Sequence, residues 1–189
     1  MGYFPFFVNV KELRGVIIGG GYIATEKVER LVHFQAKLTV IAPKISEDIQ
    51  KYGDKIHMIW REYESSDLDH ADYVIAATDI NELNEQIYAD AKQRRLLVNV
   101  VDDPPKCDYI FPSVVQRGKL VVGVSSSGAG PQVAIRLRKE IEKIIPDNIE
   151  EVLDILAEER IKAKTEIPDA SERRKYLIEL ADTYFNYEK

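Results

Sequence analysis

Five short apolar runs lie within the first 101 residues of the chain, and each is rich in β-branched side chains. They occupy residues 15–19, 37–43, 55–60, 72–78 and 96–101. Their hydrophobicity is continuous rather than alternating, which is typical of strands covered on both faces. Helical patterns follow the first, second and fourth runs, at residues 23–34, 46–53 and 80–95. This repetition predicts an α/β fold with a Rossmann-type parallel sheet between two layers of helices.

The pattern changes in the second half of the chain. Residues 113–128 predict a hairpin of two strands with a tight turn at Arg117 and Gly118. Residues 130–145 predict a helix that Pro131 opens, because a proline in the first turn loses no helical hydrogen bond. A hairpin followed by a helix is a small α+β unit and not a further strand–helix crossover.

Two amphipathic helices are predicted next, at residues 148–164 and 171–186, with Pro168 between them. The first carries an apolar stripe that needs a partner surface, either in the same chain or in a second subunit. The stripe consists of Ile149, Val152, Leu153, Leu156 and Ile161.

The chain has 189 residues, of which 45% are hydrophobic, and this is enough for one substantial core, or for a core and a smaller appended unit. We predict a nucleotide-binding type of α/β domain at residues 1–112, a hairpin-and-helix region at 113–146 and a C-terminal helical domain at 147–189.

Several classes of protein are disfavoured by composition. No apolar run approaches the roughly 20 residues of a membrane helix, and the start of the chain lacks the pattern of a secretory signal, so we expect a cytoplasmic protein. The net charge of −6 argues against nucleic-acid binding. A single cysteine, Cys107, excludes an intramolecular disulfide and argues against a thiolate zinc site.

Charge is distributed unevenly along the chain. Residues 113–143 contain six basic and two acidic residues, a net charge of +4, whereas residues 146–189 contain twelve acidic and seven basic residues, a net charge of −5. A basic patch on an acidic protein indicates an anionic small ligand, although a charged helix face is often only solvated.

A glycine-rich turn follows the first apolar run. Gly19, Gly21 and Ala24 have the spacing G-x-G-x-x-A between a predicted strand and a predicted helix, which is the context of a dinucleotide-binding turn. Gly19 permits the sharp turn, Gly21 lets backbone amides approach a pyrophosphate, and Ala24 lets the helix pack close to the sheet. The alternative is a tight strand-to-helix turn with no ligand.

The acidic residue expected after the second strand, where it would hold the ribose, is missing. The chain has Ala42, Pro43 and Lys44 there. Lys44 could meet the 2′-phosphate of NADP, or backbone groups near Pro43 and Lys44 could hold the ribose of NAD. These residues alone do not decide between the two cofactors.

Polar residues end the last two strands of the predicted sheet. Thr78 ends the fourth apolar run, and Asp102 and Asp103 directly follow the fifth. Ligands of such sheets bind beyond the carboxyl ends of the strands, so Asp102 or Asp103 could act as a base. Alternatively, both aspartates only begin a turn at Pro104 and Pro105.

Four segments together resemble the precorrin-2 dehydrogenase family, which includes stand-alone enzymes and the N-terminal module of siroheme synthase. They are "YFPFFVNVKELRGVIIGGGYIATEKVERLV", "AATDINELNEQI", "NVVDDPPKCDYIFPSVVQRGKLVVGVSSSGAGP" and "AIRLRKEIE". The resemblance implies oxidation of precorrin-2 to sirohydrochlorin with NAD as hydride acceptor, and in some members the same site also inserts ferrous iron. It further implies an NAD-binding domain at residues 1–112 and a dimerisation region at 113–146 that joins two chains in a homodimer.

The resemblance also assigns roles to individual residues. Asp102 matches the acid/base residue of the family's "NVVD" motif, while Tyr22, Ile23, Pro43 and Lys44 match NAD-contacting positions. Thr78 joins Gly19 and Gly21 among the expected cofactor-binding residues.

Precorrin-2 carries many carboxylates, so basic side chains are expected to bind it. The candidates are Arg117, Lys119, Arg136 and Arg138, which could alternatively be surface charges. Ser126 is a further candidate in the loop "SSSGAGP", where Ser127 and Gly130 depart from the family's usual pattern.

Two other interpretations stay open. One is a nucleotide-sensing domain without chemistry, which would share the glycine turn and the sheet, and the other is a chelatase that has lost its dehydrogenase activity. A metal site is not expected, because His33, His57 and His70 are scattered and each is better explained as structural or solvated.

Overall fold

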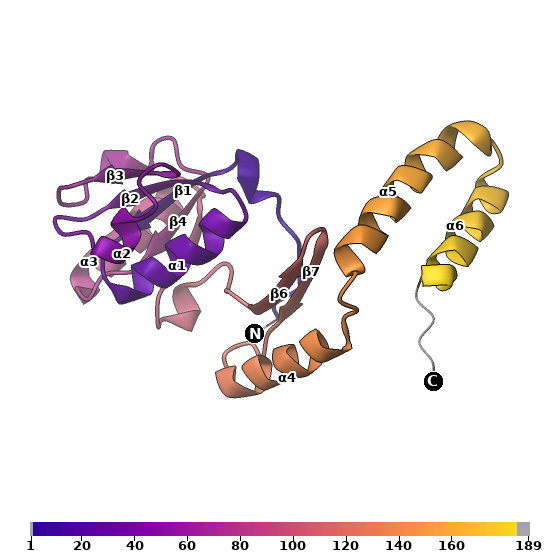
Figure 1. Cartoon of the computed structure of the whole chain (residues 1–189). Helices are drawn as coiled ribbons and strands as arrows, with labels where there is room; N and C mark the ends of the chain where they lie inside the picture. Colours follow the sequence, from indigo (N-terminus) through magenta and orange to yellow (C-terminus); the bar gives the residue numbers. More distant parts are fainter. Residues whose placement is uncertain (1, 185–189) are drawn as a thin grey trace. The chain divides into compact units, whose positions relative to one another are not determined.

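The computed structural model describes residues 2–184 and divides the chain into two compact units (Figure 1). They are Met1–Ile110 and Phe111–Lys189, so the boundary lies two residues before the predicted limit at residue 112. The further division at residue 146 stays a prediction.

The first unit contains a five-stranded parallel sheet in the order β3-β2-β1-β4-β5. Its strands are β1 (Arg14–Ile18), β2 (Lys37–Ile41), β3 (Ile56–Ile59), β4 (Tyr73–Ala76) and β5 (Leu97–Val100). The direction of strand addition reverses between β1 and β4, which opens a crevice at the carboxyl ends of these two strands. The predicted Rossmann-type sheet is confirmed.

Helices lie on both faces of this sheet (Figure 1). They are α1 (Tyr22–His33), α2 (Glu47–Gln50) and α3 (Asn81–Gln93), with the short 3-10 helices η1 (Val10–Glu12), η2 (Ser65–Leu68) and η3 (Pro104–Lys106). On one face, Ile87 and Ala91 of α3 join a core of strand residues that includes Val16 and Val74. Side chains alternate between faces along a strand, so Ile17 points to the opposite layer, where α1 contributes buried residues.

The predicted helix at residues 46–53 is shorter in the structure, where α2 has only four residues. The Ser46 side chain accepts a hydrogen bond from the Ile49 amide and starts the helix. Turns replace the helix from Lys51 onward, because Tyr52 and Gly53 are weak helix formers.

Gly15 in β1 packs directly beneath the ring of Tyr73 in β4, so replacing Gly15 with alanine is expected to destabilise the first unit. A Cβ at Gly15 would overlap the Tyr73 ring, which is only 5% exposed and has little room to move. Overpacking of this kind costs about 1–3 kcal/mol. Thermal melts should show a lower Tm for Gly15→Ala but not for Gly21→Ala, since a Cβ at Gly21 has nothing within 4 Å. Equal Tm values for Gly15→Ala and the unaltered protein would contradict this packing.

In the second unit, β6 (Ser113–Arg117) and β7 (Leu120–Val124) form an antiparallel hairpin. Arg117 pairs with Leu120, so the two turn residues are Gly118 and Lys119, and the predicted turn at Arg117 and Gly118 is wrong by one residue. The first turn position has φ +52°, a left-handed conformation that suits Gly118 and not Arg117.

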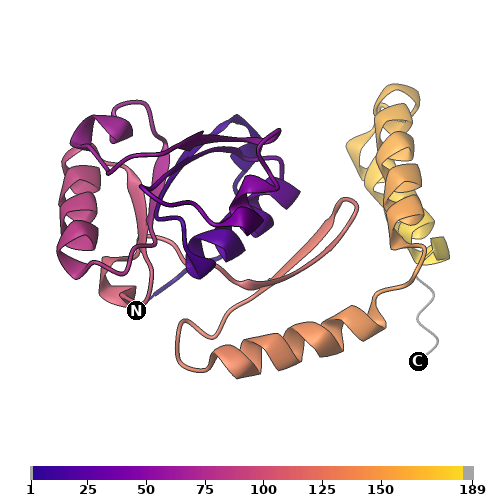
Figure 2. The same cartoon turned by 60° about the vertical axis from the view of Figure 1, so that its left-hand side comes forward.

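Three helices follow the hairpin, namely α4 (Pro131–Ile144), α5 (Ile149–Glu166) and α6 (Ala170–Tyr184). The hairpin packs against α4, and α5 packs against α6 (Figure 2). The helix predicted up to Asn186 is confirmed as far as Tyr184, and residues 185 and 186 lie outside the described residues. Within residues 2–184, no helix is long and apolar enough to cross a membrane.

The apolar stripe predicted on α5 is only partly correct. Ile149 and Val152 are buried, but Ile161 is 70% exposed. Twelve residues at 3.6 residues per turn rotate Ile161 by about one third of a turn away from Ile149. Ala163 is buried at that end of the helix instead.

Candidate active site

The glycine turn connects β1 to α1 at the carboxyl edge of the sheet. Gly19 has φ +125°, and a Cβ there would overlap the carbonyl oxygen of Ala77 after β4. The Gly19 amide donates to the carbonyl of Ile41 (3.0 Å), and the Ala77 amide donates to that of Ile18 (2.8 Å). Gly19 therefore lets the ends of three strands meet closely.

Gly21 caps the N-terminus of α1, and no side chain caps this helix end. A Cβ at Gly21 would have no other heavy atom within 4 Å, so the protein itself does not require glycine there. Open space in front of uncapped helix amides suits a phosphate group. Ala24, fully buried, lets α1 pack closely on the sheet. The turn therefore fits the pyrophosphate of a dinucleotide.

Residues that match NAD-contacting positions surround this turn. Tyr22 is 74% exposed, and its hydroxyl donates to Glu26 (3.1 Å), while Ile23 is half-buried. After β2, Pro43 and Lys44 are both exposed and accessible to a ligand. Their role in binding stays a prediction.

Thr78, after β4, is occupied by local hydrogen bonds. Its hydroxyl donates to Oδ1 of buried Asn84 (2.8 Å), and the Asn84 amide donates to the Thr78 carbonyl (3.0 Å). These bonds tie the loop after β4 to α3. Thr78 lies at the carboxyl edge of the sheet, as predicted, and its side chain stabilises the loop after β4. Contact between Thr78 and a cofactor stays a prediction.

Asp102 and Asp103 have different surroundings, although their positions after the fifth apolar run did not distinguish them without the family resemblance. Within residues 2–184, the exposed Asp102 carboxylate forms no hydrogen bond or ion pair, whereas Asp103 pairs with Lys106 (2.7 Å). Lys106 also pairs with Glu85 of α3. Asp103 therefore serves the structure of the loop, and Asp102 is available for chemistry.

The backbone at Asp102 is in the left-handed region, with φ +60°. Residues with a side chain seldom adopt this conformation, although aspartate and asparagine do so more readily than most, and such backbone conformations are concentrated at functional sites. Asp102 lies in a turn that is closed by the Asp103 amide, which donates to the Val100 carbonyl (3.2 Å). The Val101 amide donates to the Ala76 carbonyl (3.0 Å) and ties this turn to the end of β4.

Lys27 of α1 is a charged residue of this region that the sequence analysis missed. Burial lowers the pKa of its ammonium, and the negative charge of Asp102 partly opposes that shift. In the sequence, Lys27 looks like any solvated lysine of an amphipathic helix, and no motif indicates that it is partly buried near Asp102. Burial also raises the pKa of the Cys107 thiol, which keeps it protonated near neutral pH.

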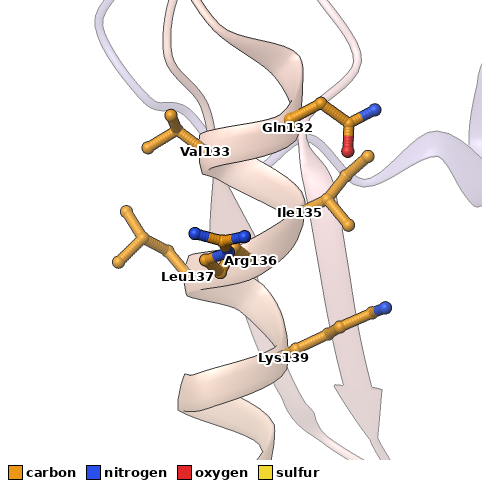
Figure 3. Close-up of a pocket in the computed structure, with 6 residues that line it drawn as sticks. All are labelled: Gln132, Val133, Ile135, Arg136, Leu137 and Lys139. Carbon is orange, nitrogen blue, oxygen red and sulfur yellow. The ribbon is translucent and has the colours of Figure 1, made fainter.

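The predicted substrate-binding residues lie in the second unit, and most of them form ion pairs there. Arg117 and Arg138 both pair with Glu142, at 3.4 and 2.5 Å. Lys119 pairs with Asp154 at 2.5 Å. Arg136 is exposed on α4 and forms no ion pair with any described residue (Figure 3).

Ser126 lies in the loop between β7 and α4. Its hydroxyl accepts a hydrogen bond from the Gly130 amide (3.1 Å), and Ser127 has φ +52°. The loop is thus a hydrogen-bonded turn that leads into α4. Contact of Ser126 with a substrate stays a prediction.

Histidines do not gather in the part of the chain that the structure describes. His33 ends α1, His57 lies in β3 and His70 lies in the turn before β4. Among the same residues, no group of three or more His, Cys, Asp or Glu side chains could hold a metal ion.

The glycine turn, the open helix end and the polar carboxyl edge define a dinucleotide-binding α/β protein. A family model described as putative NAD(P)-binding matches residues 6–113, and the chain belongs to this family.

Curated relatives confirm the resemblance inferred from the sequence motifs. The siroheme synthase of Actinobacillus pleuropneumoniae serotype 3 is 37% identical over 182 residues, which cover 95% of this chain and 37% of the relative. Siroheme synthase 2 of Yersinia pestis is 38% identical over 178 residues, which cover 93% of this chain and 38% of the relative. The chain thus spans less than half the length of these relatives.

A solved structure confirms the fold over nearly the whole chain. SirC, precorrin-2 dehydrogenase, is similar with a TM-score of 0.79 and 21% sequence identity, and the match covers 95% of this chain and 90% of SirC.

Proposed function

We propose that the chain is an NAD-dependent precorrin-2 dehydrogenase that oxidises precorrin-2 to sirohydrochlorin. The observation that carries the proposal is the Asp102 carboxylate, which has no hydrogen bond or ion pair among the described residues and lies at the same sheet edge as the glycine turn. The names of the similar proteins, siroheme synthase and precorrin-2 dehydrogenase, support the choice of substrate.

The reaction removes one hydride and one proton from the reduced macrocycle. Oxidised NAD supplies the hydride acceptor when bound. The glycine turn and the N-terminus of α1 would hold its pyrophosphate, with Tyr22, Ile23, Pro43 and Lys44 around the rest of the nucleotide. Asp102 takes the proton, because its carboxylate forms no hydrogen bond or ion pair with any residue in 2–184 that it must release first.

The macrocycle carboxylates need cationic partners. Of the four predicted side chains, Arg136 is the one that forms no ion pair within residues 2–184, so it can bind a carboxylate without an exchange. Arg117, Lys119 and Arg138 would have to exchange an acidic side chain of the protein for a substrate carboxylate. Iron insertion and a cytoplasmic location stay predictions from the sequence.

An anaerobic absorbance time course tests the proposed reaction. Precorrin-2 is generated in situ, and purified protein is added with NAD, with NADP or with neither. We expect sirohydrochlorin with NAD and none without a nicotinamide cofactor. If the protein binds NAD but no sirohydrochlorin forms, the chain is a nucleotide sensor and the proposed function is wrong.

We also propose that α4 contributes to a homodimer interface. This helix has 14 residues, yet only Ala134 is buried, while Val133 and Leu137 are more than half exposed. Val133 and Leu137 project from the same side of the helix (Figure 3). A surface of this kind needs an apolar partner, and a second copy of the chain supplies an identical one.

Charges on this face are expected to separate the two subunits. The double variant Val133→Asp and Leu137→Asp should sediment as a monomer at a concentration where the unaltered protein is a dimer, because four carboxylates would face one another. Glu140→Gln, on the same helix, should remain dimeric. A monomeric unaltered protein, or a dimeric double variant, would show that α4 is not the interface.

A further inference from the structure

Asn99 is a buried polar side chain in an otherwise apolar strand. It is 6% exposed and is aligned with Ile75 of the neighbouring strand β4, although β5 is an edge strand of the sheet. A buried amide is unfavourable unless it is hydrogen-bonded. The Asn99 amide nitrogen donates to the Tyr109 carbonyl (2.9 Å) and to the sulfur of Cys107 (3.4 Å), both beyond the loop that carries Asp102.

Cys107, which accepts the hydrogen bond from Asn99, also contacts both ends of the turn around Asp102. Its Sγ lies 3.1 Å from the Val100 carbonyl oxygen and 3.3 Å from that of Asp103. The thiol is protonated near neutral pH because burial raises its pKa, so it can donate to one of these carbonyls while accepting from Asn99.

The turn needs such support because Asp102 has a left-handed backbone conformation. A second restraint comes from Lys106, which pairs with Asp103 and Glu85. That cluster is partly exposed, and exposed ion pairs contribute little to stability. Asn99 and Cys107 add part-buried hydrogen bonds that act on both ends of the same turn.

We propose that Asn99 is a positioning residue for precorrin-2 oxidation: through Cys107 it fixes the Val100–Asp103 turn and so the direction of the Asp102 carboxylate. This inference rests on the proposed function. It predicts that the chemical step depends on a side chain that touches neither substrate nor cofactor.

Three variants test this role in the full chain. Asn99→Asp removes both donated bonds at nearly constant volume. Cys107→Ala removes the link to the turn, whereas Cys107→Ser keeps a donor and an acceptor. Asn9→Asp is the matched control, because Asn9 is exposed before β1 and aspartate preserves the bond that its Oδ1 accepts from the Lys11 amide.

The first readout is single-turnover oxidation of precorrin-2, with the Kd for NAD measured separately. Asn99→Asp and Cys107→Ala should slow the chemical step about tenfold or more, because small misplacements of reacting groups are costly, and should leave the Kd for NAD within about twofold. Cys107→Ser should restore most of the rate, and Asn9→Asp should not change it. Equal rates for Cys107→Ala and Cys107→Ser, or an unaffected Asn99→Asp, would overturn the proposal.

The second readout is amide hydrogen exchange of residues 101–107, which requires no activity. Exchange there should be faster in Asn99→Asp and Cys107→Ala and unchanged in Cys107→Ser. If the unaltered protein does not oxidise precorrin-2, the proposed function fails, and exchange still decides whether Asn99 holds the turn. Unchanged exchange in both Asn99→Asp and Cys107→Ala would overturn the inference by itself.

Discussion

Replacing Asp102 with asparagine is expected to slow precorrin-2 oxidation by about 10²–10⁴-fold, the usual contribution of a general base. Asparagine has nearly the same shape, and it tolerates the left-handed conformation at this position. The variant should therefore fold normally and bind NAD with unchanged affinity. Measurement of kcat for sirohydrochlorin formation, together with titration of NAD, separates these effects.

Asp103→Asn is the matched control for this prediction. Asp103 pairs with Lys106, so the variant weakens a partly exposed ion pair, which is worth about 0–1 kcal/mol, without removing the proposed base. We expect kcat within a few fold of that of the unaltered protein. If Asp103→Asn abolished turnover and Asp102→Asn did not, the two aspartates would have been assigned the wrong roles.

Replacing Gly21 with alanine is expected to weaken NAD binding by about 100-fold, or roughly 2.7 kcal/mol, without loss of stability. A Cβ at Gly21 meets no protein atom, so it would enter the space in front of α1 that the pyrophosphate needs. Calorimetric titration with NAD and a thermal melt without NAD measure the two effects separately.

Gly19→Ala provides the contrast. Its Cβ would overlap the Ala77 carbonyl at a positive φ, so this variant should lose both stability and binding. A Gly21→Ala variant that binds NAD as tightly as the unaltered protein would show that the nucleotide does not approach this turn.

Much of the fold was predictable because strands covered on both faces leave a strong local signal. The continuous apolar runs around Ile17 and Ile75 correspond to the central strands of the sheet. Two residues also marked local structure in the sequence: Gly19 the turn after β1, and Pro131 the start of α4. The hairpin turn was predicted one residue too early, because the turn position is set by the pairing of Arg117 with Leu120, which the sequence does not show.

Less of the candidate site was predictable, because its chemistry depends on partners distant in the sequence. Asp102 and Asp103 are adjacent, and apart from the family resemblance only the position of Lys106 in the folded loop distinguishes them. Arg117 looks like a ligand-binding cation in the sequence, but the fold places Glu142 beside it. The hydrogen bonds of Asn99 likewise become visible only when the loop after β5 is folded.

The most direct test of the proposed dehydrogenase is the stoichiometry of cofactor reduction. Purified protein is incubated anaerobically with precorrin-2 and excess NAD, and NADH and sirohydrochlorin are quantified by chromatography at several times. Hydride transfer to the cofactor predicts one NADH for each sirohydrochlorin at every time, and formation of both products about 10²–10⁴-fold slower with Asp102→Asn. Sirohydrochlorin without matching NADH, or no product from a protein that binds NAD, would contradict the proposal.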